Sequence, residues 1–246
     1  MTAAPALERG LRIRGLDVSY GPVQVLFGVD VDVNEGEVFA LLGTNGAGKS
    51  TLLRAISGLS KADQGQISLD GDDLTSTGPH DRLARGIVQV PGGKAIFPNL
   101  TVADNLRARG HTVRRRGLDE RIDLALTTFP GLRARVGRIA GSLSGGEQQM
   151  LAIAGALLLE PRILLVDELS LGLAPIVVEQ MLEVVAGLHA SGVTVVIVEQ
   201  SVNVALSVAD RAVFMEKGEV RFAGAADDLL ARDDLVRAVF LGAARG

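Results

Sequence analysis

The first part of the chain shows two kinds of hydrophobic pattern. Residues 11–20 and 23–33 (LRIRGLDVSY and VQVLFGVDVDV) alternate between apolar and polar positions, as half-buried strands do. Residues 37–43 (EVFALLG) are almost continuously apolar, which is typical of a central strand that is buried on both faces. The pattern therefore predicts three strands, and it predicts a helix over residues 49–58, where helical spacing stops at a glycine.

The pattern changes further along the chain. Between residues 81 and 141 it is mainly helical, with helical pieces at 101–109 and 118–129 that Pro and Gly interrupt. After residue 144, helical segments alternate with apolar strand-like segments, and a strand pair follows. Strands that alternate with helices predict a mostly parallel sheet flanked by helices. The expected strands and helices of this half are 163–168, 175–190, 193–199, 201–209, 211–218 and 219–224.

These patterns predict an α/β fold with a mostly parallel sheet, an antiparallel β part and an inserted helical subdomain. We expect a single domain over residues 10–246. Its α/β core would comprise residues 10–85 and 160–246, and residues 86–159 would form the helical subdomain. An Ala/Pro-rich start and a short Ala/Gly tail are expected to be disordered.

Composition narrows the classes of function. The 246 residues are 47% apolar and carry a net charge of −4, which argues against a general nucleic-acid binder. The absence of cysteine excludes disulfides, thiolate metal sites and cysteine nucleophiles, and the three histidines show no metal-ligand spacing. The N-terminus lacks a signal-peptide core, and the apolar runs are shorter than the ~20 residues that span a bilayer. We therefore expect a cytoplasmic protein whose role at a membrane would come through a partner.

A phosphate-binding loop is predicted where the third strand ends. Residues 43–50 (GTNGAGKS) fit the pattern G-x-x-x-x-G-K-[ST] between a predicted strand and a predicted helix. Glycines let backbone N–H groups curl around a polyphosphate, the lysine reaches its outer phosphates, and the serine hydroxyl binds Mg²⁺. The residues expected to bind nucleotide here are Gly43, Thr44, Asn45, Gly46, Ala47, Gly48, Lys49, Ser50 and Thr51, with Ser50 also a ligand of Mg²⁺.

Two acids end a later strand. In ILLVDE, four apolar residues place Asp167 at the carboxyl edge of a buried strand, beside the phosphate loop of a parallel sheet. We expect Asp167 to orient Mg²⁺ and Glu168 to polarise the water that attacks the γ-phosphorus. The pair alone is weak evidence, since solvated strand ends often carry acids, but the phosphate loop strengthens it.

A second anion site is predicted 102 positions after the first, counted from Gly43 to Gly145. The stretch LSGGEQQ opens a helical pattern, and Ser144 with Glu147 forms a capping-box pattern. Free N–H groups at such a helix start bind anions. The residues expected to contact nucleotide at this site are Ser144, Gly145, Gly146 and Glu147.

These motifs, in this order and spacing, resemble those of the ATP-binding subunits of ABC transporters, and the resemblance covers essentially the whole chain. It implies a P-loop NTPase core and a head-to-tail dimer in which each ATP lies between the phosphate loop of one subunit and the LSGGEQQ signature of the other. The implied cofactors are ATP and Mg²⁺. Tyr20 occupies the position of the aromatic residue that stacks on adenine, although an ordinary strand residue is the alternative. Residues 170–181, 197–201 and 235–242 (SLGLAPIVVEQM, IVEQS and LVRAVFLG) resemble most the branched-chain amino-acid uptake subunits.

Some positions depart from the family pattern. Gly92 stands where the family usually has a glutamine, directly after the loop proline Pro91. Gln89 is nearby but is expected on the preceding strand. Leu169 stands where the family usually has the proline after the catalytic glutamate. Ala174 stands where the family usually has the aspartate of the following loop. Gln200 stands in place of the histidine near the γ-phosphate, where a neutral amide binds phosphate oxygen but cannot act as an acid. The amino-acid uptake subgroup shares the alanine and the glutamine, so only Gly92 indicates slower hydrolysis.

The expected function is an ATP-hydrolysing subunit, with Glu168 and Gln200 catalytic, that energises uptake of branched-chain or other hydrophobic amino acids. It would bind the cytoplasmic face of the cell membrane through permease subunits, pair with a same or different ATPase subunit, and depend on an extracytoplasmic solute-binding protein. The alternatives are the ATPase of a lipid or lipopolysaccharide exporter and an ATP-binding regulatory subunit with little hydrolysis. A soluble switch on nucleic acid is disfavoured, because only Arg114–Arg116 point to such a partner and short charge runs are usually solvated.

Overall fold

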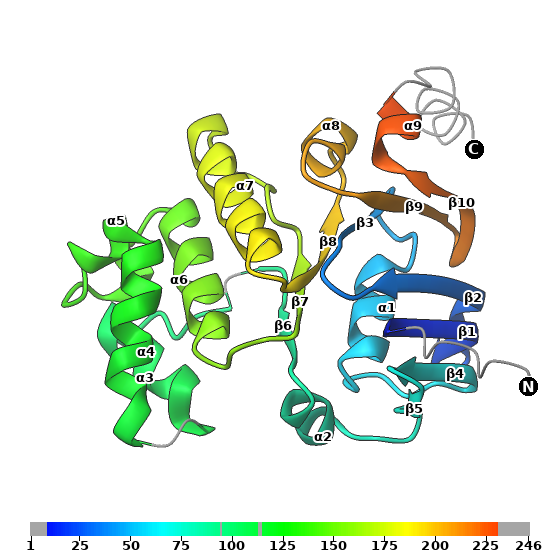
Figure 1. Ribbon diagram of the computed structural model, residues 1–246, viewed down its shortest axis with the longest axis horizontal. Helices are drawn as coiled ribbons and strands as arrows, with labels where there is room; N and C mark the ends of the chain where they lie inside the picture. The colour runs from blue at the N-terminus through cyan, green and yellow to red at the C-terminus, as the bar shows by residue number, and fades with distance from the viewer. Residues whose placement is uncertain (1–8, 94, 113–114, 231–246) are drawn as a thin grey trace, which may run out of the picture.

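The computed structural model describes residues 9–93, 95–112 and 115–230, and its centre is a six-stranded sheet (Figure 1). The strand order is β10-β9-β3-β8-β7-β6, and only the β9–β10 pair is antiparallel among the described strands of this sheet. The predicted mostly parallel sheet is therefore confirmed. Its strands are β3 (Val38–Gly43), β6 (Ile87–Val90), β7 (Ile163–Asp167), β8 (Thr194–Glu199), β9 (Arg211–Glu216) and β10 (Glu219–Ala225).

The predicted antiparallel part is a second, four-stranded sheet with the order β2-β1-β4-β5. The burial patterns explain why the two sheets differ. Along β1 and β2 buried and accessible residues alternate over much of the length, whereas every residue of β3, β7 and β8 is buried. The alternating strands thus cover one side of a core, and the continuously apolar strands lie within it. The strands of this sheet are β1 (Gly10–Tyr20), β2 (Val23–Asn34), β4 (Gln64–Leu69) and β5 (Asp72–Asp73).

Helices fill the space around the sheets and form a separate group at one end of the molecule. Figure 1 shows α3, α4, α5 and α6 together at this end, while α1 lies among the strands of the core. The helices are α1 (Lys49–Ile56), α2 (Pro79–Ala84), α3 (Val102–Arg109), α4 (Arg115–Thr128), α5 (Pro130–Arg133), α6 (Gly145–Leu157), α7 (Pro175–Ala190), α8 (Val202–Leu206) and α9 (Ala226–Leu230), with short 3₁₀ turns at Gly110–Thr112 and Ala140–Ser142.

Apolar side chains form one core on each side of the large sheet. The first core joins α1 to both sheets, and Leu41 and Leu52 belong to it. The second joins the other face of the sheet to the helical group and to α7, and Val166 and Leu151 belong to it. The signature helix α6 therefore packs into the same core as the strand that ends in Asp167, which couples the helical group to the site.

The structure adds detail to the expected boundaries. The helix predicted at residues 175–190 is α7, whereas the helix predicted at 201–209 ends earlier, because α8 ends at Leu206. The strand β6 pairs with β7 in the large sheet although it falls within residues 86–159. The division into core and helical subdomain remains a prediction, and the expected disordered ends lie outside the described residues.

A buried arginine fixes the far end of α1. Arg82 of α2 is 2% exposed and donates hydrogen bonds to the carbonyl oxygens of Ala55, Ile56 (2.7 Å) and Leu74 (2.7 Å). The positive charge lies against the C-terminal end of α1, which is the negative end of the helix dipole. Because the phosphate loop leads into the other end of α1, Arg82 helps to hold that loop in place.

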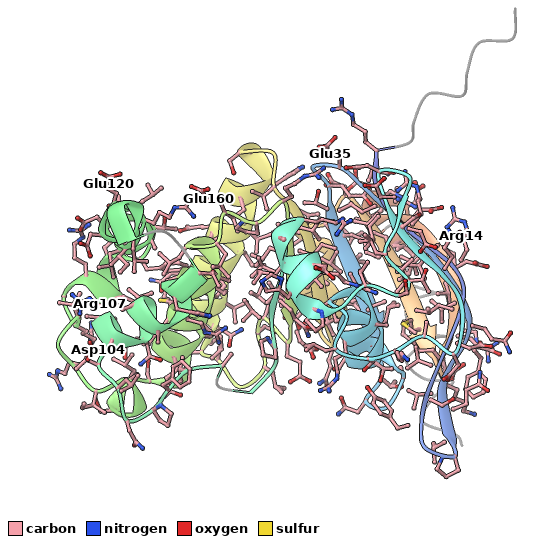
Figure 2. The ribbon with its side chains drawn as sticks, turned by 90° about the horizontal axis from the view of Figure 1, so that it is seen from below. Arg14, Glu35, Asp104, Arg107, Glu120 and Glu160 are labelled. Atoms are coloured by element: carbon pink, nitrogen blue, oxygen red, sulfur yellow. The ribbon has the colours of Figure 1, made fainter. Side chains whose placement is uncertain are left out.

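Charged side chains of both signs lie on the outside of the molecule, as the labelled examples in Figure 2 show. Arg107 pairs with Asp104 on α3 at 3.3 Å, and Arg14 of β1 pairs with Asp32 of β2 at 2.6 Å. No helix within the described ranges is both long enough and apolar enough to cross a membrane.

Candidate functional site

The site lies at the carboxyl edge of the parallel strands. The register places Leu42 of β3 beside Glu199 of β8, and Val198 of β8 beside Asp167 of β7. Because these strands are parallel, the phosphate loop after β3, the acids after β7 and the amide after β8 all emerge on the same side. The fold thus brings together residues that are far apart in the sequence.

The phosphate loop has a backbone that only glycine adopts easily. Gly43 and Gly48 have φ angles of 149° and 98°, in the region that disfavours side chains. A Cβ atom on Gly43 would lie 2.3 Å from the carbonyl oxygen of Met215, and one on Gly48 would lie 2.7 Å from Leu26 Cδ2. The helix α1 begins at Lys49 without a side-chain cap, so its first N–H groups remain available for an anion.

Lys49 lies inside this loop and is only 6% exposed. Its Nζ donates to the carbonyl oxygens of Gly43 at 2.7 Å and Thr44 at 2.9 Å. Burial lowers the pKa of Lys49, while the charges of Asp167, Glu168 and Glu199 act to raise it. Its ammonium is therefore surrounded by carboxylates and loop carbonyls, and a bound phosphate would add a further anionic partner.

Asp167 and Ser50 have the properties of a cation site. Asp167 is 7% exposed, and its Oδ1 has no hydrogen-bond partner. Burial raises its pKa, an effect that Glu168 increases and that a hydrogen bond with Ser50 and the charge of Lys49 oppose. Within the described chain no group of three or more His, Cys, Asp or Glu could enclose a metal. A cation bound here would therefore need ligands from a nucleotide or water, and this set of oxygens suits Mg²⁺.

Glu168 and Gln200 meet beside this cluster. Glu168 has a φ of 59°, and its N–H donates to the carbonyl oxygen of Val198 at 3.1 Å. The Gln200 amide Nε2 donates to Glu168 Oε1 at 3.1 Å. This contact spans 32 positions of the chain and holds the carboxylate from one side.

Gly92 lies on the other side of the same carboxylate. A Cβ atom built on Gly92 would lie 3.5 Å from Glu168 Oε2 and 3.7 Å from Asp167 Cγ. A side chain at this position would therefore point into the site. Gln89 does not take its place, because it lies on β6 and its Oε1 accepts a hydrogen bond from Ser57 Oγ at 2.6 Å.

Tyr20 ends β1 close to the start of α1. Its ring is accessible, and its hydroxyl shares a hydrogen bond of 2.9 Å with Ser60 Oγ. Slight burial acts to raise its pKa, but hydrogen bonds with Ser60 and Thr51 and the neighbouring Arg54 lower it overall. The Tyr20 hydroxyl thus lies along α1, and stacking of its ring on adenine remains a prediction.

The signature residues lie away from the phosphate loop in sequence and on a different helix. Ser144 caps α6: the Glu147 N–H donates to Ser144 Oγ at 3.3 Å, and the Ser144 N–H donates to Glu147 Oε2 at 2.9 Å. Both members of the predicted capping box are confirmed. Gly146 packs so tightly on α7 that a Cβ atom would lie 2.4 Å from Val177 Cγ1, whereas Gly145 faces open space beyond Leu173.

No hydrogen bond or ion pair within the described residues joins Ser144–Glu147 to the phosphate loop. Ser144 and Gly145 are exposed to solvent. The two helix starts predicted to bind anions are thus separate in this chain, and only the first lies among the site acids.

Sequence reasoning missed one buried group of this site. Glu199, which ends β8 and is 2% exposed, accepts hydrogen bonds from Ser170 N at 2.7 Å and Ser170 Oγ at 2.8 Å. The signal was available, because an acid after an apolar strand is the feature that singled out Asp167. The partner Ser170 could not be predicted, since it follows a different strand.

A family model described as ABC transporter matches residues 26–170 of the chain. Among curated relatives, the high-affinity branched-chain amino acid transport ATP-binding protein BraG of Pseudomonas aeruginosa is 44% identical over 82% of this chain and 86% of its own length. The probable branched-chain amino acid transport ATP-binding protein LivF of Archaeoglobus fulgidus is 41% identical over 89% and 94%. The lipopolysaccharide export system ATP-binding protein LptB of Haemophilus influenzae is 34% identical over 94% and 97%.

Solved structures show the same fold. An ATP-binding cassette of an ABC transporter in its ADP conformation superposes with a TM-score of 0.84 at 27% identity and covers 95% of this chain and 98% of its own. A dimeric cassette in a post-hydrolysis state, bound to ADP and phosphate, gives a TM-score of 0.80 at 26% identity over 88% and 98%.

Proposed function

Because this chain belongs to the family of ABC transporter ATP-binding subunits, which hydrolyse ATP to drive transport, we propose that it energises the uptake of branched-chain amino acids. The observation that carries its role as an ATPase is the cluster of Lys49, Asp167, Glu168 and Gln200 at one edge of the sheet. The two relatives named for branched-chain amino acid transport share more identity with this chain than the lipopolysaccharide relative does, which supports the choice of cargo.

The chemistry follows from the contacts. The loop N–H groups and Lys49 would bind the phosphates of ATP, and Ser50 with Asp167 would hold Mg²⁺, which would neutralise charge on the phosphates. Glu168 orients the attacking water and accepts its proton. Gln200 holds Glu168 by its amide and, as a neutral group, does not exchange a proton itself.

The exposed signature supports a head-to-tail dimer. Ser144 and Gly145 are exposed at the start of α6, so a second subunit can bring its nucleotide against this helix start. The γ-phosphate then contacts both subunits, and its loss on hydrolysis lets them separate. A similar cassette that is dimeric with ADP and phosphate supports this arrangement.

The subunit works at a membrane through partners. We assign it to the cytoplasmic face, bound to permease subunits that are supplied with amino acid by an extracytoplasmic binding protein. Membrane vesicles that contain the chain and its permease should take up labelled leucine when ATP is inside, and Lys49→Ala should abolish this uptake. Export of lipopolysaccharide instead of leucine uptake would reject the amino-acid assignment and favour the LptB-like alternative.

Dimerisation tests the nucleotide chemistry directly. Glu168→Gln should bind ATP and Mg²⁺ without hydrolysis and shift from monomer to dimer in light scattering, whereas Glu168→Gln with Ser144→Arg should remain monomeric. A dimer that forms equally well with the Ser144→Arg change would contradict the role of the signature. Tight ATP binding without any dimer would indicate that the partner is a different ATPase subunit.

A further inference from the structure

Glu199 joins two loops of the site. It ends β8, and its carboxylate accepts hydrogen bonds from the backbone N–H and the hydroxyl of Ser170, which lies in the loop after β7. Burial raises the pKa of Glu199, while the Ser170 donors and the backbone N–H groups of Gln200 and Ser201 act to lower it.

The two loops that Glu199 joins also carry Glu168 and Gln200, the residues expected to act in hydrolysis. Ser170 is two residues after Glu168, and Gln200 directly follows Glu199. Gln200 donates to Glu168 Oε1 at 3.1 Å, so the loops meet at two places, once by Gln200 and Glu168 and once by Glu199 and Ser170. Both contacts are part-buried, and Glu199 itself is 2% exposed.

The conformation of Glu168 explains why a second contact is useful. Glu168 has a φ of 59°, a conformation that is unfavourable for a residue with a side chain and persists only where its surroundings hold it. The next residue, Leu169, does not fix its own φ as a proline would, so the loop depends on contacts with its surroundings. The Glu199–Ser170 contact supplies the missing restraint through hydrogen bonds.

We propose that Glu199 is a positioning residue for hydrolysis, which acts through Ser170 to hold Glu168 against Gln200. This inference rests on the proposed role of Glu168. Glu199 does not touch nucleotide in this assignment, so its loss should lower the rate of hydrolysis and leave ATP binding unchanged.

The test uses single-turnover ATP hydrolysis and ATP binding by the purified full chain. Ser170→Ala removes the hydroxyl donor and should lower the hydrolysis rate about tenfold, less than the hundredfold that a misplacement of 1 Å can cost. Glu199→Gln, which keeps the shape of the side chain, should give a similar decrease, and the double variant should be no slower than either single one. Ser170→Thr keeps the hydroxyl and should restore the rate. Ser207→Ala, which removes an exposed hydroxyl on the end of α8, is the matched control.

Three results would overturn the proposal. The first is that Ser170→Ala and Glu199→Gln retain the full rate. The second is that their effects on the rate simply multiply in the double variant. The third is that ATP binding and thermal stability fall as much as the rate does, which would indicate a general structural role. Glu168→Gln separates this inference from the proposed function. If Glu168→Gln hydrolyses ATP at the natural rate, the role of Glu168 is wrong, and with it the proposal for Glu199 in its present form. If Glu168→Gln is inactive but the Glu199 variants are fully active, only the proposal for Glu199 fails.

Discussion

Replacement of Asp167 by asparagine tests the electrostatics of the site. Asp167 is 7% exposed, its Oδ1 has no hydrogen-bond partner, and burial raises its pKa. The raised pKa already includes the opposing attraction of Lys49 and the hydrogen bond with Ser50, so on balance the fold disfavours the charged form. We therefore expect Asp167→Asn to stabilise the nucleotide-free chain at neutral pH, although it should abolish hydrolysis.

The size of this gain follows from the negative charge, which asparagine removes from this buried group. The desolvation penalty of such a group is about 1–3 kcal/mol, and 1 kcal/mol shifts Tm by about 2–4 °C in a domain of 150–250 residues. The expected rise in Tm is therefore roughly 2–12 °C. The natural chain loses stability as pH rises from the unfolded pKa of Asp167 to its higher folded pKa, because the folded state binds more protons in that window. The advantage of the Asp167→Asn variant over the natural chain should thus be complete at neutral pH and vanish below the unfolded pKa of about 4.

When Mg²⁺ and ATP are added, the natural chain should become more stable than the Asp167→Asn variant. A ligand at one hundred times its Kd stabilises the natural chain by about 2.7 kcal/mol, whereas Asp167→Asn lacks the negative charge that attracts the cation. Differential scanning calorimetry at about pH 7.5 and pH 3.5, with and without nucleotide, measures both effects. Asp72→Asn, at an exposed aspartate of β5, is the control and should leave Tm unchanged. A nucleotide-free Asp167→Asn chain that melts below the natural chain at neutral pH would refute the reasoning, because it would show that the attraction to Lys49 exceeds the cost of burial.

Further changes test other parts of the site. Gly92→Gln should raise turnover roughly tenfold, because a side chain there points at Glu168 Oε2, and an unchanged or lower rate in steady-state hydrolysis would contradict this. Tyr20→Leu should raise the KM for ATP by roughly tenfold with little change in kcat, since stacking on a base contributes ~1–3 kcal/mol, and Tyr20→Phe should behave almost like the natural chain. Arg82→Met should lower the free energy of unfolding in urea by about 3 kcal/mol, because it leaves several buried carbonyl oxygens without donors. A loss below about 1 kcal/mol would show that water replaces the guanidinium.

Local patterns in the sequence gave reliable predictions where they were long or chemically distinctive. The helix at residues 175–190 and the continuously buried strands agree with their hydropathy patterns, and the capping box at Ser144 has both of its expected hydrogen bonds. The end of α8 was predicted three residues too far along the chain, because short helices depend on their surroundings for stability.

Contacts between distant segments were not predictable from the same patterns. The Glu199–Ser170 pair spans 29 positions and the Ser57–Gln89 pair spans 32. The spacing of neighbouring residues in the sequence indicates neither contact. Arg82 was not recognised as a buried residue, since its partners are backbone carbonyls of another helix, and any residue type presents such carbonyls.

Short stretches of sequence were enough to predict the chemistry of this protein: a glycine loop expected to bind phosphate, two acids after a buried strand and a capped helix expected to form a second anion site. These features are local, because each depends on the order of a few neighbouring residues. Which of them meet depends on the three-dimensional fold. Parallel pairing of β3, β8 and β7 brings Lys49, Asp167 and Glu199 to one edge, and burial there shifts the pKa values of all three. Such shifts arise from removal of water and from nearby charges, and both depend on the folded arrangement and not on the order of residues.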